Sequence, residues 1–102
     1  MDQEQIVTEL IVNSGNARAK ALSAIQYARQ GNFKEAEEKM KESKESLEKA
    51  HRFQTSLLQK EAAGENKTGF SLLMVHGQDH LMNAMTVRDL AVEIIAMLNE
   101  RK

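Results

Sequence analysis

The segment 76–80, His-Gly-Gln-Asp-His, carries the side chains of this chain that are best suited to chemistry. A helix turns by about 100° per residue, so residues three and four positions apart share a face. If the segment is helical, one side of it holds His76, Asp79, His80 and Asn83. The surrounding apolar pattern predicts that this stripe is buried. Buried polar groups need partners or a function, so the stripe is the candidate site.

Several roles fit two histidines on one helix. They could be core histidines satisfied by their neighbours. Histidines four apart can also chelate zinc, but a zinc protease needs a glutamate where this chain has Gly77. An aspartyl-histidine phosphorelay module usually has a lysine and a glycine just after its histidine, and that pattern is not met by Gly77, Gln78 and Asp79.

A phosphohistidine carrier of another kind is the remaining chemistry. Neutral imidazole is nucleophilic near pH 7 and is a good leaving group once phosphorylated. Gln78 and His80 could orient the His76 ring or donate to phosphoryl oxygens, and structural hydrogen bonding explains each of them equally well. Gly77 could leave room beside His76 for a partner to approach.

Length, charge and composition limit the class of protein. The 102 residues suit one domain, residues 1–102, with one core. The chain has 14 lysine and arginine residues and 15 aspartate and glutamate residues, so its net charge is −1. This balance does not indicate the basic surface that binding to nucleic acid requires. The absence of cysteine favours a cytoplasmic chain without thiolate metal sites. Residues 1–5 do not resemble a signal peptide, and no apolar run approaches the roughly 20 residues of a membrane span.

The residue types predict an all-α chain. There is no proline, and helix-forming residues abound. We expect helices from about 2 to 29, from 32 up to a polar loop over 64–69, and from about 70 to 100. Asp2 with Gln5, and Asn32 with Glu35, resemble capping boxes. Short connections favour antiparallel neighbours, so the expected fold is an antiparallel up-down-up three-helix bundle.

The third helical stretch has two apolar stripes where a three-helix bundle needs one. The second stripe lies around Asp79 and consists of Leu72, Val75, Met82 and Met85. A helix that is apolar on most of its circumference is surrounded by protein. In so small a domain, other copies of the chain would best cover the extra stripe, so we expect a homo-oligomer in which the third helices meet.

A family resemblance covers essentially the whole chain. Residues 74–85 (MVHGQDHLMNAM), continuing through 89–95 (DLAVEII), resemble the lactose/cellobiose (also chitobiose) type of enzyme IIA of the phosphoenolpyruvate-dependent sugar phosphotransferase system. Further matches lie at 15–18, 28–36, 50–55 and 59–62. One departure is Gly77, where the family commonly has alanine, which lowers helix propensity by up to about 1 kcal/mol.

The resemblance implies a phosphotransferase component that works through a phosphohistidine. His76 would accept a phosphoryl group from the phosphocarrier HPr and pass it to a IIB protein or domain, which phosphorylates sugar arriving through the membrane IIC component. A IIA component does not contact the sugar, so lactose, cellobiose and chitobiose systems all remain open. No independent turnover of a small molecule is expected.

The resemblance also implies a homotrimer of three-helix bundles with Asp79 at the trimer axis, where it binds a divalent metal. Three carboxylates at an apolar seam would repel one another, and a hard cation such as Mg²⁺ with oxygen ligands would relieve that repulsion. Asn16 and Arg18 could border the site from the first helix, where Arg18 offers a charge-assisted donor, although a plain surface role fits them as well. The alternative from another class is a structural helical adaptor whose polar stripe only fixes register.

Overall fold

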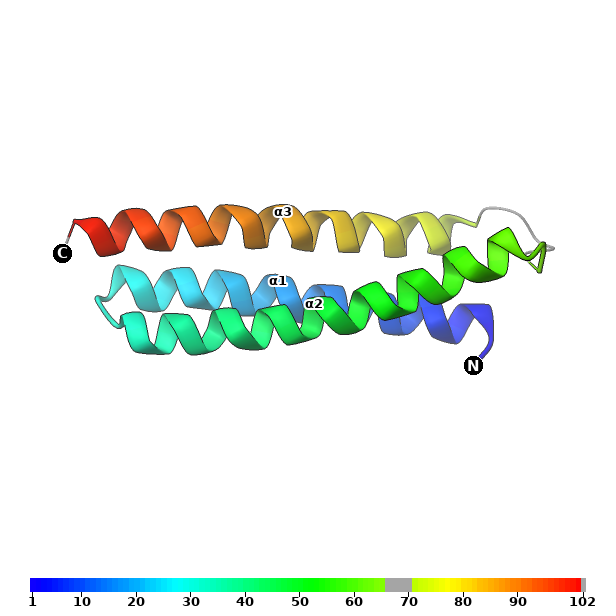
Figure 1. Ribbon diagram of the computed structural model, residues 1–102, viewed down its shortest axis with the longest axis horizontal. Coiled ribbons are helices and arrows are strands. Elements are labelled where there is room, and N and C mark those ends of the chain that lie inside the picture. The colour runs from blue at the N-terminus through cyan, green and yellow to red at the C-terminus, as the bar shows by residue number, and fades with distance from the viewer. Residues whose placement is uncertain (66–70, 102) are drawn as a thin grey trace.

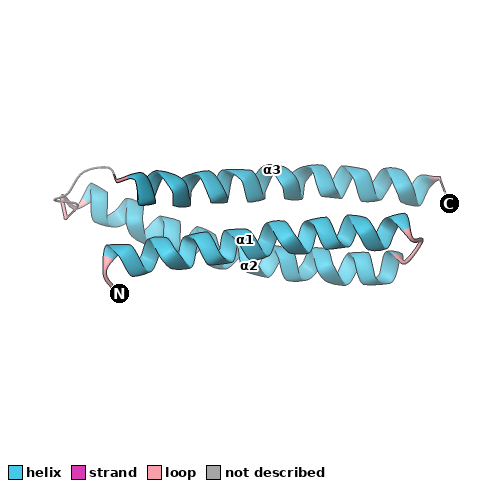
Figure 2. Cartoon of the chain, turned by 180° about the vertical axis from the view of Figure 1, so that it is seen from behind, coloured by secondary structure: helices cyan, strands magenta, loops and turns pink. Residues whose placement is uncertain are grey.

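Three long helices form a bundle in the computed structural model, which describes residues 1–65 and 71–101. They are α1 (Gln3–Arg29), α2 (Phe33–Ala62) and α3 (Leu72–Glu100). They lie side by side in a rod of 54 × 18 × 18 Å (Figures 1 and 2). α1 and α3 run in the same direction, and α2 runs antiparallel to both. The predicted all-α, up-down-up three-helix bundle is therefore confirmed.

The helix starts follow from capping side chains that satisfy the free backbone N–H groups of a first turn. At α1, the backbone N–H of Gln5 donates to Asp2 Oδ1 at 2.8 Å, and the N–H of Asp2 donates to Gln5 Oε1 at 2.9 Å. Asn32 accepts from the N–H of Glu35 and caps α2. Ser71 accepts from the N–H of Met74 and sets the start of α3. Position 70, where the third helix was predicted to begin, and residues 66–69 of the predicted loop lie outside the described residues.

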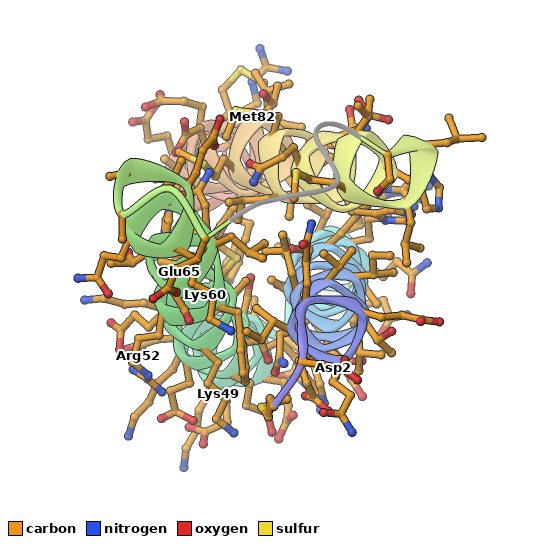
Figure 3. All side chains as sticks on the ribbon, turned by 90° about the vertical axis from the view of Figure 1, so that its right-hand side faces the viewer. Asp2, Lys49, Arg52, Lys60, Glu65 and Met82 are labelled. Carbon is orange, nitrogen blue, oxygen red and sulfur yellow. The ribbon has the colours of Figure 1, made fainter. Side chains whose placement is uncertain are left out.

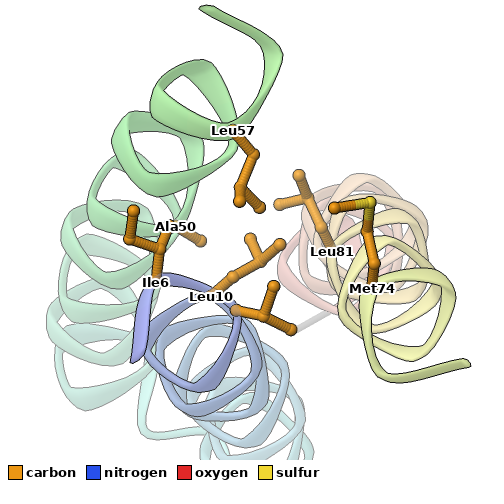
Figure 4. Close-up of a cluster of buried hydrophobic side chains, with 7 residues drawn as sticks. Ile6, Leu10, Ala50, Leu57, Met74 and Leu81 are labelled. Carbon is orange, nitrogen blue, oxygen red and sulfur yellow. The ribbon is translucent and has the colours of Figure 1, made fainter. Parts of the chain in front are cut away.

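The core lies along the axis of the bundle, and α1 contributes most to it. Near the start of α1, the largest cluster joins all three helices (Figure 4) and consists of Ile6, Val7, Leu10, Ala50, Leu57, Met74 and Leu81. Alanines dominate the other end, where Ala24, Ala28 and Ala36 are buried together. Leu58 of α2, next to the buried Leu57, is 53% exposed. α3 packs chiefly on α1 and has much less contact with α2.

The outer side of α3 is apolar and uncovered. Leu72 is 86% exposed, Val75 54% and Met82 48%. In an end-on view Met82 lies on the outer side of α3, whereas charged side chains such as Lys49 and Arg52 radiate from α2 (Figure 3). Three residues of the second apolar stripe therefore face solvent in the single chain, whereas the fourth, Met85, is half-buried and packs against the core cluster. Among the described residues, no helix has both the length and the apolar character to cross a membrane.

Candidate functional site

The candidate site lies in the first half of α3 and is centred on two histidines. His76 is exposed and His80, one turn further along, is half-buried. Their Nε2 atoms lie 3.1 Å apart, and the rings meet edge to face with centroids 4.4 Å apart. The prediction that this stripe is buried is wrong for the single chain, since Asp79 and Asn83 are exposed as well. The error arose because the apolar residues beside the stripe belong to the uncovered outer side of α3.

The short distance between the Nε2 atoms restricts which nitrogens of the two rings carry protons. A hydrogen bond between two imidazole nitrogens needs a proton on one of them and a lone pair on the other. If His80 carries the Nε2 proton, the lone pair of His76 Nε2 points at that proton and is held in a defined direction. His76 is then protonated at Nδ1, which is the tautomer in which Nε2 can act as a nucleophile.

Gly77 faces inward and allows α3 to approach α1 closely. A Cβ atom added at Gly77 would lie 3.1 Å from Val7 Cγ1, 3.3 Å from Leu10 Cδ2 and 3.7 Å from Ile11 Cγ1. The expectation that Gly77 makes room for a partner protein is therefore wrong. Its missing side chain accommodates α1, and this contact fixes the distance of His76 from that helix.

Gln78 points away from the histidines. It lies two positions after His76, which places it about 200° around the helix. There its Oε1 accepts a hydrogen bond from Nε2 of Gln54 on α2 at 2.8 Å. Analysis of the sequence did not identify this pair, although Gln54 occupies a position of the apolar series of α2 and so had to face another helix. The contact supports the structural account of Gln78.

Asp79 is exposed and lies between His76 and the apolar residues Val75 and Met82 around the axis of α3. It follows His76 by three positions and precedes His80 by one, so it is about 60° and 100° from them around the helix. Its neighbours three or four positions away are all exposed, namely Val75, His76, Met82 and Asn83. Within residues 1–65 and 71–101, no three histidine, cysteine or acidic side chains are close enough to hold a metal ion. A metal at Asp79 would thus need carboxylates from further copies of the chain.

Asn16 and Arg18 are exposed on α1, as their predicted position at the border of the site requires. Ile11 is the last residue of α1 that Gly77 approaches, and Arg18 follows it by seven positions, about 10 Å along the helix. In the described part of the chain, neither side chain makes a hydrogen bond or ion pair that would direct it to His76. Their contribution to the site remains a prediction.

Comparison with known proteins gives consistent matches over nearly the whole chain. Residues 5–99 match the family model described as the lactose/cellobiose-specific IIA subunit of the PTS system. The lichenan-specific phosphotransferase enzyme IIA component of Bacillus subtilis is 52% identical over 96 residues, which is 94% of this chain and 86% of that protein.

Solved structures of related proteins have the same fold. The crystal structure of the PTS cellobiose-specific enzyme IIA from Bacillus anthracis has a TM-score of 0.91 at 51% identity and covers 98% of this chain and 92% of its own. The IIA(Chitobiose) of Escherichia coli, solved in solution as a complex with HPr, has a TM-score of 0.84 at 41% identity, with 98% and 96% covered. The chain therefore belongs to the lactose/cellobiose-specific IIA subunits of the phosphotransferase system, and it is a phosphotransfer protein of a sugar-uptake system.

Proposed function

We propose that His76 Nε2 accepts a phosphoryl group from phospho-HPr and passes it to a IIB component. The observation that carries this proposal is the exposed His76 ring, whose Nε2 lies 3.1 Å from Nε2 of His80. The exposure of His76 suits a group that must meet two partner proteins in turn. The complex of the related chitobiose IIA with HPr supports HPr as the donor. An exposed pair also argues against the adaptor hypothesis, because a polar group fixes helix register only when it is buried.

The transfer needs little more than positioning and charge stabilisation. The lone pair of His76 Nε2 attacks phosphorus, the bond from phosphorus to the donor protein breaks, and the donor keeps the electron pair of that bond. The Nε2 proton of His80 then has a phosphoryl oxygen as its acceptor in place of His76 Nε2. In the second transfer, a nucleophile of the IIB component forms a bond to phosphorus, the His76–phosphorus bond breaks, and its electron pair returns to Nε2. His80 thus positions the ring before transfer and donates to the phosphoryl group afterwards.

The test of this proposal is phosphorylation by purified components. Incubation with phosphoenolpyruvate, enzyme I and HPr should give one phosphate per chain, labile in acid and stable in base. His76→Ala should take up none. The matched control is His51→Ala, because His51 is the histidine that lies on α2, outside the pair on α3. Equal phosphorylation of the wild type and His76→Ala would refute the assignment.

We also propose that the chain functions as a homotrimer in which the α3 helices meet. Leu72, Val75 and Met82 support this, because their exposed side chains form an apolar stripe along α3. Contiguous exposed apolar surface of this kind marks an interaction site. In this proposal the other subunits of the trimer cover the apolar stripe. The histidines of α3 then lie at the edge of the subunit interface.

The proposed trimer would place three Asp79 carboxylates around its axis, and we propose that they share a divalent cation such as Mg²⁺. The donor set fits, since carboxylate oxygens are the ligands that Mg²⁺ and Ca²⁺ prefer. The cation would relieve the repulsion among the three carboxylates. In this proposal Asp79 binds the cation, whereas His76 and His80 carry out the phosphoryl transfer.

A further inference from the structure

We propose that His76 and His80 also form a bidentate site for a transition-metal ion, Zn²⁺, Ni²⁺ or Cu²⁺, and that occupation of this site blocks phosphoryl acceptance. The metal-binding part of this inference stands on the geometry of the pair. The blocking part rests on the proposed role of His76 as the phosphoryl acceptor.

The distance between the two Nε2 atoms suits two neighbouring ligands of one ion. Metal–imidazole bonds are about 2.0–2.1 Å long. Two such nitrogens are therefore about 3.3 Å apart at a tetrahedral angle and about 2.9 Å apart at a right angle. The observed 3.1 Å lies between these values, so an ion fits with small rotations of the rings. The rings meet edge to face with their centroids 4.4 Å apart.

Binding requires both Nε2 lone pairs, and the neutral pair can supply them. One ring of the hydrogen-bonded pair carries its proton on Nε2, and this proton must leave that nitrogen before the metal binds. Transfer of the proton to Nδ1 of the same ring, by way of water, leaves the ring neutral. No oxidant, reductant or further reactant is needed, and both rings then present Nε2 to the ion. Water completes the coordination sphere because His76 is exposed.

The nitrogen site differs in chemistry and in place from the oxygen site proposed at Asp79. Imidazole suits Zn²⁺, Ni²⁺ and Cu²⁺, whereas Mg²⁺ prefers carboxylate oxygens and water. Asp79 lies about 60° around the helix from His76 and about 100° from His80, on the side of His76 that is turned away from His80. Among the three histidines of the chain, only His76 and His80 share a helix face. The remaining one, His51, is half-buried on α2.

Metal binding and phosphorylation exclude each other because both use the lone pair of His76 Nε2. A bound ion occupies the nitrogen that would attack phosphorus. A phosphoryl group on Nε2 in turn removes one of the two metal ligands. Only the unphosphorylated carrier would therefore bind a free transition-metal ion at this site.

The direct test titrates the unphosphorylated protein with Zn²⁺ or Ni²⁺, with Mg²⁺ as the comparison ion. Calorimetry gives affinity and stoichiometry, and long-range ¹H–¹⁵N spectra identify the ring nitrogens that bind. We expect one Zn²⁺ per chain and shifts of both Nε2 resonances, with no such shifts for Mg²⁺. Loss of either ligand, in His76→Gln or His80→Gln, should weaken binding by about tenfold or more, because the second ligand binds intramolecularly. The matched control His51→Gln should bind as the wild type does.

Two results of the titration would overturn the metal site. One is binding that His80→Gln leaves unchanged, since the ion would then have a single histidine ligand. The other is an equal loss of affinity in His51→Gln, which would place the ion elsewhere.

A second experiment tests the blocking effect with phospho-HPr that has been separated from enzyme I. The rate of phosphate transfer to the wild type should fall when Zn²⁺ is present and recover after chelation by EDTA. The ratio of the rates with and without Zn²⁺ should return toward one in His80→Gln, which keeps His76 but lacks the second ligand. Equal inhibition of both proteins would overturn the blocking role. If the titration succeeds but His76 takes up no phosphate at all, the proposed function fails while the metal site stands.

Discussion

Gln54 donates a hydrogen bond from Nε2 to Oε1 of Gln78 across 2.8 Å, and this bond ties α2 to α3 beside the candidate site. Both side chains are half-buried. A second hydrogen bond between these helices lies further along α3, where Arg88 Nη2 donates to the backbone oxygen of Met40 at 3.3 Å. The bond between the two glutamines also commits the Gln78 side chain to the face of α3 that is turned away from His76.

Replacement of one glutamine of this pair should cost more than replacement of both. Gln78→Leu leaves the Gln54 amide half-buried without its partner, and we expect a loss of about 1–3 kcal/mol in the free energy of unfolding. The double variant Gln54→Leu/Gln78→Leu should recover most of this loss, because two apolar side chains of similar size then meet. Urea denaturation of the two single variants and the double variant gives the coupling energy.

The same double variant separates the two accounts of Gln78. If Gln78 is structural, the double variant should take phosphate from phospho-HPr at a rate close to that of the wild type. A stable double variant with a severely reduced transfer rate would instead assign Gln78 to the phosphoryl group.

Alanine at Gly77 and at Gly15 should have opposite effects on stability. Both glycines lie inside helices, where alanine gains up to about 1 kcal/mol in helix propensity. At Gly15 an added Cβ meets nothing within 4 Å, so Gly15→Ala should stabilise the fold by about 0.5–1 kcal/mol. At Gly77 it meets Val7 Cγ1 at 3.1 Å, and crowding that costs about 1–3 kcal/mol offsets the gain. In thermal unfolding, the midpoint temperature of Gly15→Ala should be higher than that of the wild type. The midpoint temperature of Gly77→Ala should be equal to that of the wild type or lower.

Asp79→Leu should preserve or strengthen the proposed trimer. The substitution replaces a cluster of like charges at the axis by apolar packing, and such replacements are often neutral or stabilising. Analytical ultracentrifugation with and without EDTA measures the effect. We expect the wild-type trimer to dissociate more readily once divalent cations are removed. Dissociation of the variant should be the same with and without these cations. The control is Glu45→Leu on the outer face of α2, which should behave as the wild type does. Dissociation of Asp79→Leu in the presence of metal would contradict the prediction.

HPr and IIB should compete for one face of the chain. Both must reach His76 Nε2, and Leu73, 39% exposed three positions before His76, offers apolar contact beside it. Transient complexes bury small areas, so one shared face is sufficient. Chemical-shift mapping with each partner in turn should give overlapping footprints on α3 around His76. Two separate footprints would refute this prediction.

Periodicity and capping residues were enough to predict the helices and their order. Asp2 and Asn32 begin α1 and α2 as predicted, because a cap is a local interaction that adjacent residues determine. The spacing of His76 and His80 likewise placed their rings together.

The surroundings of each helix face were harder to predict, because periodicity identifies a face without saying what covers it. The apolar residues near Asp79 suggested burial of the polar stripe, yet Val75 and Met82 are exposed in the single chain. Gly77 was assigned to the partner side, although it faces α1. Gln54 is spaced with the apolar residues of α2, but its partner on α3 depends on the relative shift of two helices that are separated in the sequence.

The rod shape of the bundle separates the candidate site from the last turn of α3. His76 lies in the second turn of that helix, and the 24 residues from there to Glu100 span about 36 Å at the rise of an α-helix. A fluorophore or surface tether attached at Glu100 would therefore lie well beyond a protein docked on the histidines. Binding kinetics of both relay partners can be measured on the immobilised chain with the docking end free.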